Sequence, residues 1–200
     1  MNFVTIFSVG FMLYLAFVYF FKRQLEISIQ VSSIDKETYI VRTGTEKEKQ
    51  TAADLLARIR INLNKIVKHV YDKYKNDSRW GEPVRRLKRR YSPDPMRITE
   101  SSEDSNYTSY TLSKGKKMVF CLRSKKTNQF HDFNLLMFVA VHELSHIITV
   151  ASGSQSHGKE FHTNFGFLLK EATDMGLYEK INFESNPKEY CGIQVTESPI

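Results

Sequence analysis

The sequence predicts an α+β fold: a small sheet with an edge hairpin, packed against a long supporting helix and a buried helix, and preceded by one transmembrane helix. Three patterns support this prediction: an uncharged apolar run at the start, long segments with apolar residues at helical spacing, and short alternating segments between them. At 41% hydrophobic and 26% charged residues, the chain is neither disordered nor fibrous. Its 200 residues suit an anchor over residues 1–23 and one globular domain over 24–200.

The first segment, from Phe3 to Phe21, contains neither charge nor proline. A helix of this length, at about 1.5 Å per residue, spans roughly the hydrocarbon core of a bilayer. Lys22 and Arg23 follow the run and no basic residue precedes it, so the positive-inside rule predicts a single-pass protein with its C-terminal domain on the cytoplasmic side. A cleaved signal peptide is the first alternative, but a basic n-region and a small-residue cleavage site are missing. A buried core helix is the second.

The next segment predicts short strands and then a long helix. Residues 25–31 alternate between apolar and polar side chains, and residues 39–41 suit a second short strand. Thr45 and Glu48 have the spacing of a capping box, in which each side chain accepts a hydrogen bond from the backbone of the other. Behind them apolar residues recur at helical spacing, which predicts an amphipathic helix from about 46 to 75.

The second half of the chain predicts a hairpin and two helices. Residues 107–112 and 118–122 are strand-like, and the Ser-Lys-Gly-Lys segment between them suits a turn. From about 132 to 149 the chain is apolar on nearly all sides of a helix, which indicates a buried helix. An amphipathic helix is expected from about 159 to 175, and Gly176 suits its C-terminal end.

The net charge of +7 favours anionic partners. Much of it lies in a basic, proline-broken stretch over residues 83–98. Anionic lipid or nucleic acid would bind through five side chains of this stretch: Arg85, Arg86, Lys88, Arg89 and Arg90. A solvated basic face with no partner is the alternative.

Two cysteines, Cys121 and Cys191, are too few for a disulfide framework. The CxxC pairs of a zinc ribbon are absent from the sequence. Free thiols in a reducing compartment are therefore expected.

An HExxH motif, formed by His142, Glu143 and His146, falls within the predicted buried helix. The i, i+4 spacing places both imidazoles on one helical face, where they can reach one Zn²⁺ ion. Glu143 lies beside that face and can hydrogen-bond a metal-bound water as a general base. The alternative is a hydrogen-bonded core network, but uncompensated histidines and a carboxylate are costly in so apolar a helix.

A catalytic zinc ion usually takes three protein ligands and one water. His157 is the favoured third ligand, because it follows a flexible polar stretch that lets the chain turn back towards the motif. The alternatives that remain open are His162 and, less favoured, Glu160, Asp174 and Cys191. His69 and His131 are interpreted as ordinary surface or core histidines.

The motif and its surroundings resemble the minimal zinc peptidases of the WLM and SprT-like group, and most of all the small WLM-like proteins of large DNA viruses. The resemblance spans roughly residues 39–192 and is carried by five segments: AADLLARIR, MVFCLR, VAVHELSHI, HGKEFHTNFGFLLKEA and EYCGI. It implies a zincin-like metallopeptidase fold with a substrate groove beside an edge strand. It also implies one catalytic Zn²⁺ on His142, His146 and His157, with Glu143 as the base.

The leading hypothesis is a membrane-anchored zinc metallopeptidase, in a host or virion membrane, that hydrolyses peptide bonds of protein substrates. A zinc-activated water would attack the carbonyl while Glu143 accepts its proton. Tyr178 and Tyr190 are candidates for stabilising the developing oxyanion. Two alternatives stay open: a DNA-associated protease acting on DNA–protein crosslinks, as members of the resembling group commonly do, and a non-catalytic zinc-binding membrane protein.

Overall fold

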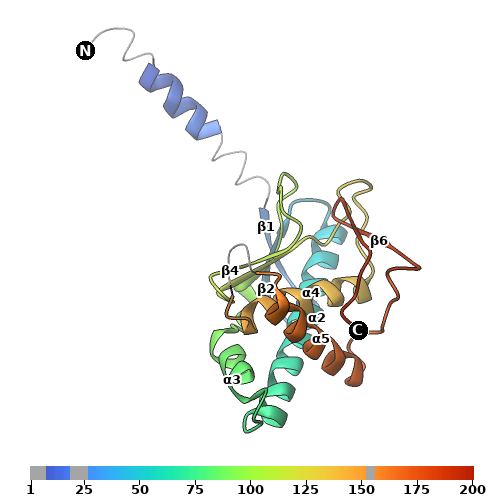
Figure 1. Cartoon of the computed structure of the whole chain (residues 1–200). Helices are drawn as coiled ribbons and strands as arrows, with labels where there is room; N and C mark the ends of the chain where they lie inside the picture. The colour runs from blue at the N-terminus through green and yellow to red at the C-terminus, as the bar shows by residue number, and fades with distance from the viewer. Residues whose placement is uncertain (1–7, 19–26, 152–155) are drawn as a thin grey trace.

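The computed structural model describes residues 8–18, 27–151 and 156–200 (Figure 1). These residues form helices and short strands mixed along the chain. After the helical residues 8–18 the elements are β1 (Ile27–Val31), β2 (Thr38–Arg42), α2 (Glu46–Tyr74), α3 (Gly81–Arg90), the 3-10 helix η1 (Pro95–Arg97), β3 (Ile98–Glu100), β4 (Tyr110–Leu112), β5 (Lys117–Phe120), α4 (Phe133–Ile148), α5 (Lys159–Asp174), β6 (Lys188–Tyr190) and β7 (Ile193–Val195).

The transmembrane helix predicted over residues 1–23 is wrong. A helix of residues 8–18 is roughly 16 Å long, about half of a bilayer's hydrocarbon core. Among the residues that the structure describes, no helix combines the length and the apolar character that crossing a membrane requires. Residues 1–7 and 19–26, with Lys22 and Arg23, lie outside the described residues. The predicted single-pass localisation with a cytoplasmic domain is therefore wrong as well.

The long helix α2 supports the rest of the domain. Its capping box is confirmed: the Thr45 hydroxyl accepts a hydrogen bond from the Glu48 backbone N–H, and the Glu48 carboxylate accepts one from the Thr45 N–H at 2.8 Å. Its apolar stripe is buried, and α2 contacts the helices α3, α4 and α5 as well as the strands β1 to β3 (Figure 1). Local capping and helical periodicity thus fix this element, as the sequence predicts.

The predicted hairpin is the pair β4–β5. β5 is the central strand of a three-stranded sheet, parallel to β3 and antiparallel to β4, so that β4 is an edge strand of this sheet. In the turn between them Gly115 has a φ of +104°, and a Cβ there would come within 2.7 Å of the Arg90 carbonyl oxygen. Glycine is therefore required at this position.

Helix α3 lies in the basic stretch for which no helix was expected. Its proline, Pro83, stands in the first turn, where the missing N–H has no intrahelical partner to lose. Arg86 donates to the carbonyl of Ile148 at 2.8 Å, and Arg90 donates to Ile147 and Thr149 at 3.1 and 3.2 Å. Two of the five basic side chains predicted to bind lipid or nucleic acid therefore hydrogen-bond the C-terminal carbonyl groups of α4, where positive charge is stabilising.

Candidate metal centre and cleft

Helix α4 carries the HExxH motif. The Asp132 side chain caps the helix by accepting a hydrogen bond from the Leu135 N–H at 3.0 Å, and most of the residues behind it are buried. His142 and His146 lie one turn apart, with their Nε2 atoms at 3.3 Å. The predicted buried helix is confirmed, and it fixes the two imidazoles on one face.

His157 lies just before α5 and meets this pair. Its Nε2 is 3.2 Å from the Nε2 of His142, and the ligand atoms of the three histidines all lie within 4.8 Å of one another. Residues 152–155 of the connecting stretch lie outside the described residues. His162 lies in the first turn of α5 and does not belong to a metal-binding group in the described part of the chain.

The Phe161 ring packs against all three imidazoles. Its ring centroid lies 4.8 Å from that of His142, 4.5 Å from His146 and 4.8 Å from His157. The side chain is 1% exposed. From sequence this residue is only one member of an apolar helical face, so its role as the backing of the site could not be foreseen.

The electrostatics favour neutral imidazoles, the form that binds metals. Burial, reinforced by the neighbouring histidines, lowers the pKa of His142 to about 3. Burial and His157 lower the pKa of His146 to about 4, and burial also lowers the pKa of His157. Three neutral imidazole nitrogens that converge at this spacing fit a tetrahedral Zn²⁺ ion with one position open.

Glu143 is 3% exposed and its carboxylate meets the edge strand β4. The Thr111 hydroxyl lies 2.9 Å from the Glu143 Oε2, to which it donates, and 3.3 Å from the Glu143 carbonyl oxygen. Burial raises the pKa of Glu143 to about 7, while the Thr111 hydrogen bond opposes this rise. A carboxyl group with a pKa near neutrality is suited to accept and return a proton.

A cleft of about 960 Å³ opens over these residues. One wall is β4 with the following turn, another is the histidine face of α4 and α5, and a third is Tyr190 with the C-terminal residues 193–199. Of the two tyrosines proposed from sequence, Tyr190 lines the cleft. Tyr178 packs against Phe138, and its hydroxyl accepts a hydrogen bond from the Ile181 N–H.

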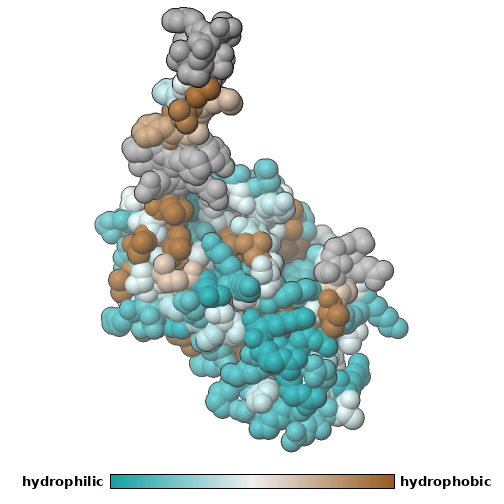
Figure 2. Space-filling view, turned by 90° about the vertical axis from the view of Figure 1, so that its left-hand side faces the viewer, coloured by the Kyte–Doolittle hydropathy of each residue, from teal (hydrophilic) through white to brown (hydrophobic). Residues whose placement is uncertain are grey.

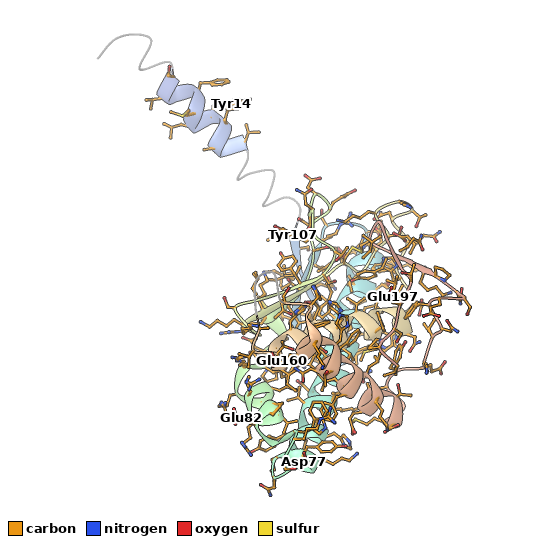
Figure 3. The ribbon with its side chains drawn as sticks, in the orientation of Figure 1. Tyr14, Asp77, Glu82, Tyr107, Glu160 and Glu197 are labelled. Carbon is orange, nitrogen blue, oxygen red and sulfur yellow. A yellow bond between two sulfur atoms is a disulfide. The ribbon has the colours of Figure 1, made fainter. Side chains whose placement is uncertain are left out.

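Residues 149–151, between the second and third histidines, are hydrogen-bonded by two charged side chains. Lys114 donates to the carbonyl oxygens of Thr149, Val150 and Ala151, the last at 2.7 Å. Glu160, at the start of α5 (Figure 3), accepts hydrogen bonds from the backbone of Val150 and Ala151 at 3.0 and 3.2 Å. Glu160, a less favoured candidate ligand, therefore has a structural role.

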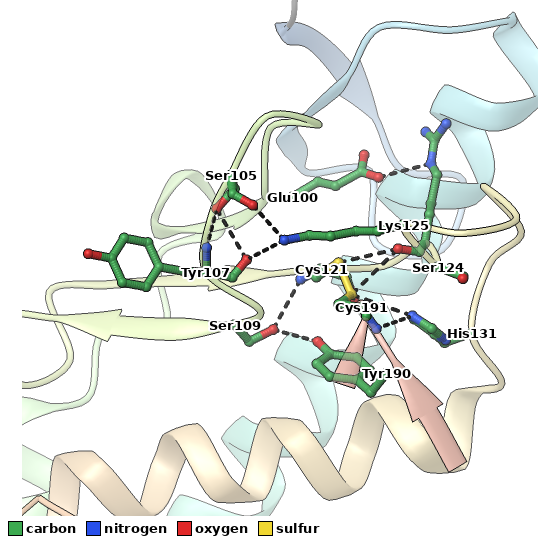
Figure 4. The surroundings of a disulfide bond; sticks show 12 residues. Glu100, Ser105, Tyr107, Ser109, Cys121, Ser124, Lys125, His131, Tyr190 and Cys191 are labelled. Atoms are coloured by element: carbon green, nitrogen blue, oxygen red, sulfur yellow. Dashed lines mark hydrogen bonds and ion pairs between the residues drawn. A yellow bond between two sulfur atoms is a disulfide. The ribbon is translucent and has the colours of Figure 1, made fainter. Parts of the chain in front are cut away.

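The remaining candidates lie away from the three histidines. Asp174 pairs with Lys170, and His69 lies 2.9 Å from a carboxylate oxygen of Glu171. The prediction of free thiols is wrong, because Cys191 forms a disulfide with Cys121 (Figure 4). The two cysteines are 70 residues apart in sequence, and no local pattern announces their contact.

In a reaction that uses Glu143 as a general base, Thr111→Val is expected to lower kcat by roughly tenfold, the scale of one hydrogen bond to a charged group. The Thr111 bond stabilises the carboxylate of Glu143, so its loss raises the pKa of that group and moves the rise of activity to higher pH. The metal content should not change. Thr111→Ser keeps the hydroxyl and should restore both kcat and the pH profile. An unchanged profile in Thr111→Val would remove this residue from the site.

Comparison with known proteins finds relatives in viruses. The chain is 33% identical over 176 residues to the uncharacterised protein R325 of Acanthamoeba polyphaga mimivirus, which covers 88% of this chain and 86% of that protein. It is 34% identical over 87 residues to the uncharacterised protein 136R of Invertebrate iridescent virus 6, covering 42% of this chain and 44% of that protein.

No family model matches the sequence. Among solved structures, a mutant of Wss1 from Saccharomyces cerevisiae matches 69% of this chain and 92% of its own, with 16% identity and a TM-score of 0.45. The similarity to the mimivirus protein extends over most of both chains. The chain belongs to the family of the mimivirus protein R325.

Proposed function

We propose that this protein is a zinc-dependent peptidase that hydrolyses peptide bonds of protein substrates. The observation that carries the proposal is the position of Glu143: a buried carboxylate with a raised pKa, next to three converging neutral histidines in one cleft. Three histidines with a fourth position open are typical of catalytic zinc sites, whereas structural sites use four protein ligands.

In the proposed reaction His142, His146 and His157 hold the metal. When bound, zinc lowers the pKa of its water and polarises the scissile carbonyl. Glu143 accepts the proton of the attacking water and returns it to the leaving amine, while Thr111 holds its carboxylate in place. Burial keeps bulk water from competing for the same carboxylate.

The substrate proposed here is an extended peptide. β4 is an edge strand, and edge strands offer unpaired backbone groups to which a peptide can add by main-chain hydrogen bonds. Its residues Tyr110 and Thr111 line the cleft beside Glu143. A peptide that adds to β4 would therefore pass the metal centre. These features support a zincin-like arrangement of the kind that the WLM and SprT-like resemblance implies.

Metal removal tests this function. The purified chain is expected to contain about one zinc ion and to cut an unfolded general substrate such as denatured casein. A chelator should abolish cleavage, because the reaction needs the metal. Added Zn²⁺ should restore it, because the three histidines already lie together in the metal-free structure. Full zinc occupancy with no cleavage of any unfolded protein would instead support a non-catalytic zinc protein.

A second candidate is a protease acting on proteins crosslinked to DNA. One observation favours it: Arg85, Lys88 and Arg89 remain exposed on α3, on a hydrophilic side of the domain (Figure 2). Arg85 and Arg89 also pair with Glu82 on the same helix, which reduces their free charge. This candidate requires that DNA stimulate cleavage and that the stimulation fall steeply with salt. Cleavage indifferent to DNA, with binding only to anionic vesicles, would reject it.

A further inference from the structure

A second group of potential metal ligands lies beside Tyr190 (Figure 4), a residue that also lines the cleft over the three histidines. It consists of Cys121 directly after β5, His131 just before α4, and Cys191 in the turn between β6 and β7. Their ligand atoms all lie within 4.8 Å of one another, and both cysteines are 3% exposed. Three segments that are far apart in the sequence thus bring two sulfur atoms and one imidazole to one buried point.

The turn itself indicates why a cysteine stands there. Cys191 and Gly192 are the two residues between the paired ends of β6 and β7, and their φ angles are +50° and +92°. A two-residue turn with both φ positive favours Asn-Gly or Asp-Gly, and a cysteine in its first position is strained. The chemistry of the thiol, and not the propensity of the turn, therefore explains the residue.

A ring nitrogen of His131 lies beside the Cys191 sulfur. The backbone N–H of Cys191 donates to the His131 Nε2 at 3.4 Å, so this nitrogen is the acceptor of a neutral imidazole. The Cys191 Sγ lies 3.4 Å from the same nitrogen. The carbonyl oxygen of Arg123 lies 3.2 Å from the Cys121 Sγ and 3.5 Å from the Cys191 Sγ, and so adds an oxygen donor.

We propose that Cys121, His131 and Cys191, with the carbonyl oxygen of Arg123 as the fourth protein ligand, form a second, non-catalytic zinc site that becomes available when the disulfide is reduced. A dithiol reductant supplies two electrons: its own sulfurs join, the Cys121–Cys191 bond breaks, and each cysteine sulfur takes a proton. Zn²⁺ then replaces the two thiol protons, which pass to water. Two thiolates and one imidazole neutralise the ion, so the buried site carries no net charge.

The same backbone positions of Cys121 and Cys191 are compatible with the disulfide and with the zinc-bound thiolates. In a tetrahedral site with Zn–S bonds of about 2.3 Å, the sulfurs stand roughly 3.8 Å apart. The Cα atoms of the two cysteines are 6.3 Å apart, near the wide end of the usual disulfide range of about 4.4–6.8 Å. Side-chain rotation therefore suffices to separate the sulfurs, without movement of β5 or the hairpin.

The cross-link has a consequence for the cleft. Tyr190 precedes Cys191, lines the cleft, and shares a hydrogen bond with Ser109, whose hydroxyl also accepts from the Cys121 N–H (Figure 4). The disulfide or the metal would each hold this wall to the end of β5. The wall then keeps its place in oxidising and reducing conditions, provided that zinc is present.

Cobalt titration of the full chain tests the second site independently of peptidase activity. Reduced with a phosphine, the chain should bind two equivalents of Co²⁺, and the disulfide form should bind one. Only the second site contains thiolates, so only the reduced chain should show a thiolate-to-cobalt charge-transfer band in the near ultraviolet. Cys121→Ser should lose the band and keep one equivalent. A reduced chain without the band would overturn the proposal.

Two histidine variants separate this proposal from the proposed function and from misfolding. His131→Gln keeps both cysteines and should weaken the thiolate site by more than ~10-fold, while His69→Gln, at a residue that belongs to neither ligand group, should leave it unchanged. In His157→Ala the band should persist with one equivalent, which shows the second site even where the catalytic site fails. Equal cobalt affinity of the thiolate site in His131→Gln and His69→Gln would exclude His131 as a ligand.

Discussion

Replacing Glu143 with glutamine is expected to leave zinc bound and to lower peptide hydrolysis by at least ~10²-fold, the usual scale for a positioned general base. The change preserves size and polarity, and His142, His146 and His157 all remain. What it removes is the group that accepts the proton of the attacking water. The measurement is metal content and turnover on the same preparation, because only full zinc with lost activity fits the proposed role.

The same variant should also change how the stability of the metal-free protein depends on pH. Burial raises the pKa of Glu143 from 4.5 to about 7, so the folded chain holds its proton more tightly than the unfolded chain. In the metal-free protein this carboxyl group therefore lowers the stability as the pH rises from about 4.5 to about 7. Glu143→Gln lacks this contribution, so its stability relative to the wild type should increase as the pH rises through this window. Denaturation of both metal-free proteins at a series of pH values measures the difference.

Glu179→Gln is the matched control, because Glu179 is an exposed glutamate that does not line the cleft. It should keep zinc, activity and the pH dependence of stability. Full activity with full zinc in Glu143→Gln would remove Glu143 from the mechanism. Loss of zinc would make it a ligand or a structural support instead.

The parts of this molecule that the sequence predicts are those determined by neighbouring residues. The capping box of Thr45 and Glu48 and the apolar stripe behind it are local, and α2 begins and ends within about one residue of its predicted bounds. The same holds for the i, i+4 spacing of His142 and His146. Helical geometry alone brings these two imidazoles together.

What the sequence misses depends on distant contacts. Thr111 reaches Glu143 across 32 positions of the chain, and the disulfide joins residues 70 apart. Neither partner carries a local signal. The stretch around Pro83 was expected to be irregular, although a proline in a first helical turn permits the helix that forms. Three-residue strands such as β3 and β6 are too short to show a period.

The transmembrane helix predicted for the apolar start of the chain was wrong for a different reason. Hydropathy and the charges at Lys22 and Arg23 predict a spanning helix, but they measure composition and not helix length. The described helical residues 8–18 cover too short a distance for a bilayer. Composition alone therefore gave the wrong class for this segment.

His157→Ala is expected to lower zinc affinity by more than ~100-fold. Removing a direct ligand should cost at least as much as removing a group that only hydrogen-bonds a ligand, and that loss costs up to this factor. His162→Ala is the matched control: this histidine is on the neighbouring turn, lines the same cleft and touches Phe161 edge-on at 5.7 Å. It should keep its zinc within a few-fold. Dialysis against a low zinc concentration, followed by metal analysis, compares the two variants.

Thermal unfolding provides a second, independent measurement of the same ligand. A metal that binds only the folded chain stabilises it by about 2.7 kcal/mol at a hundredfold excess over Kd, so zinc should raise the Tm of the wild type and of His162→Ala. The Tm of His157→Ala should respond much less at the same concentration, because two imidazoles, those of His142 and His146, are left to hold the ion. Equal zinc content and an equal shift of Tm in both variants would move the third ligand away from His157. A loss confined to His162→Ala would place it on α5.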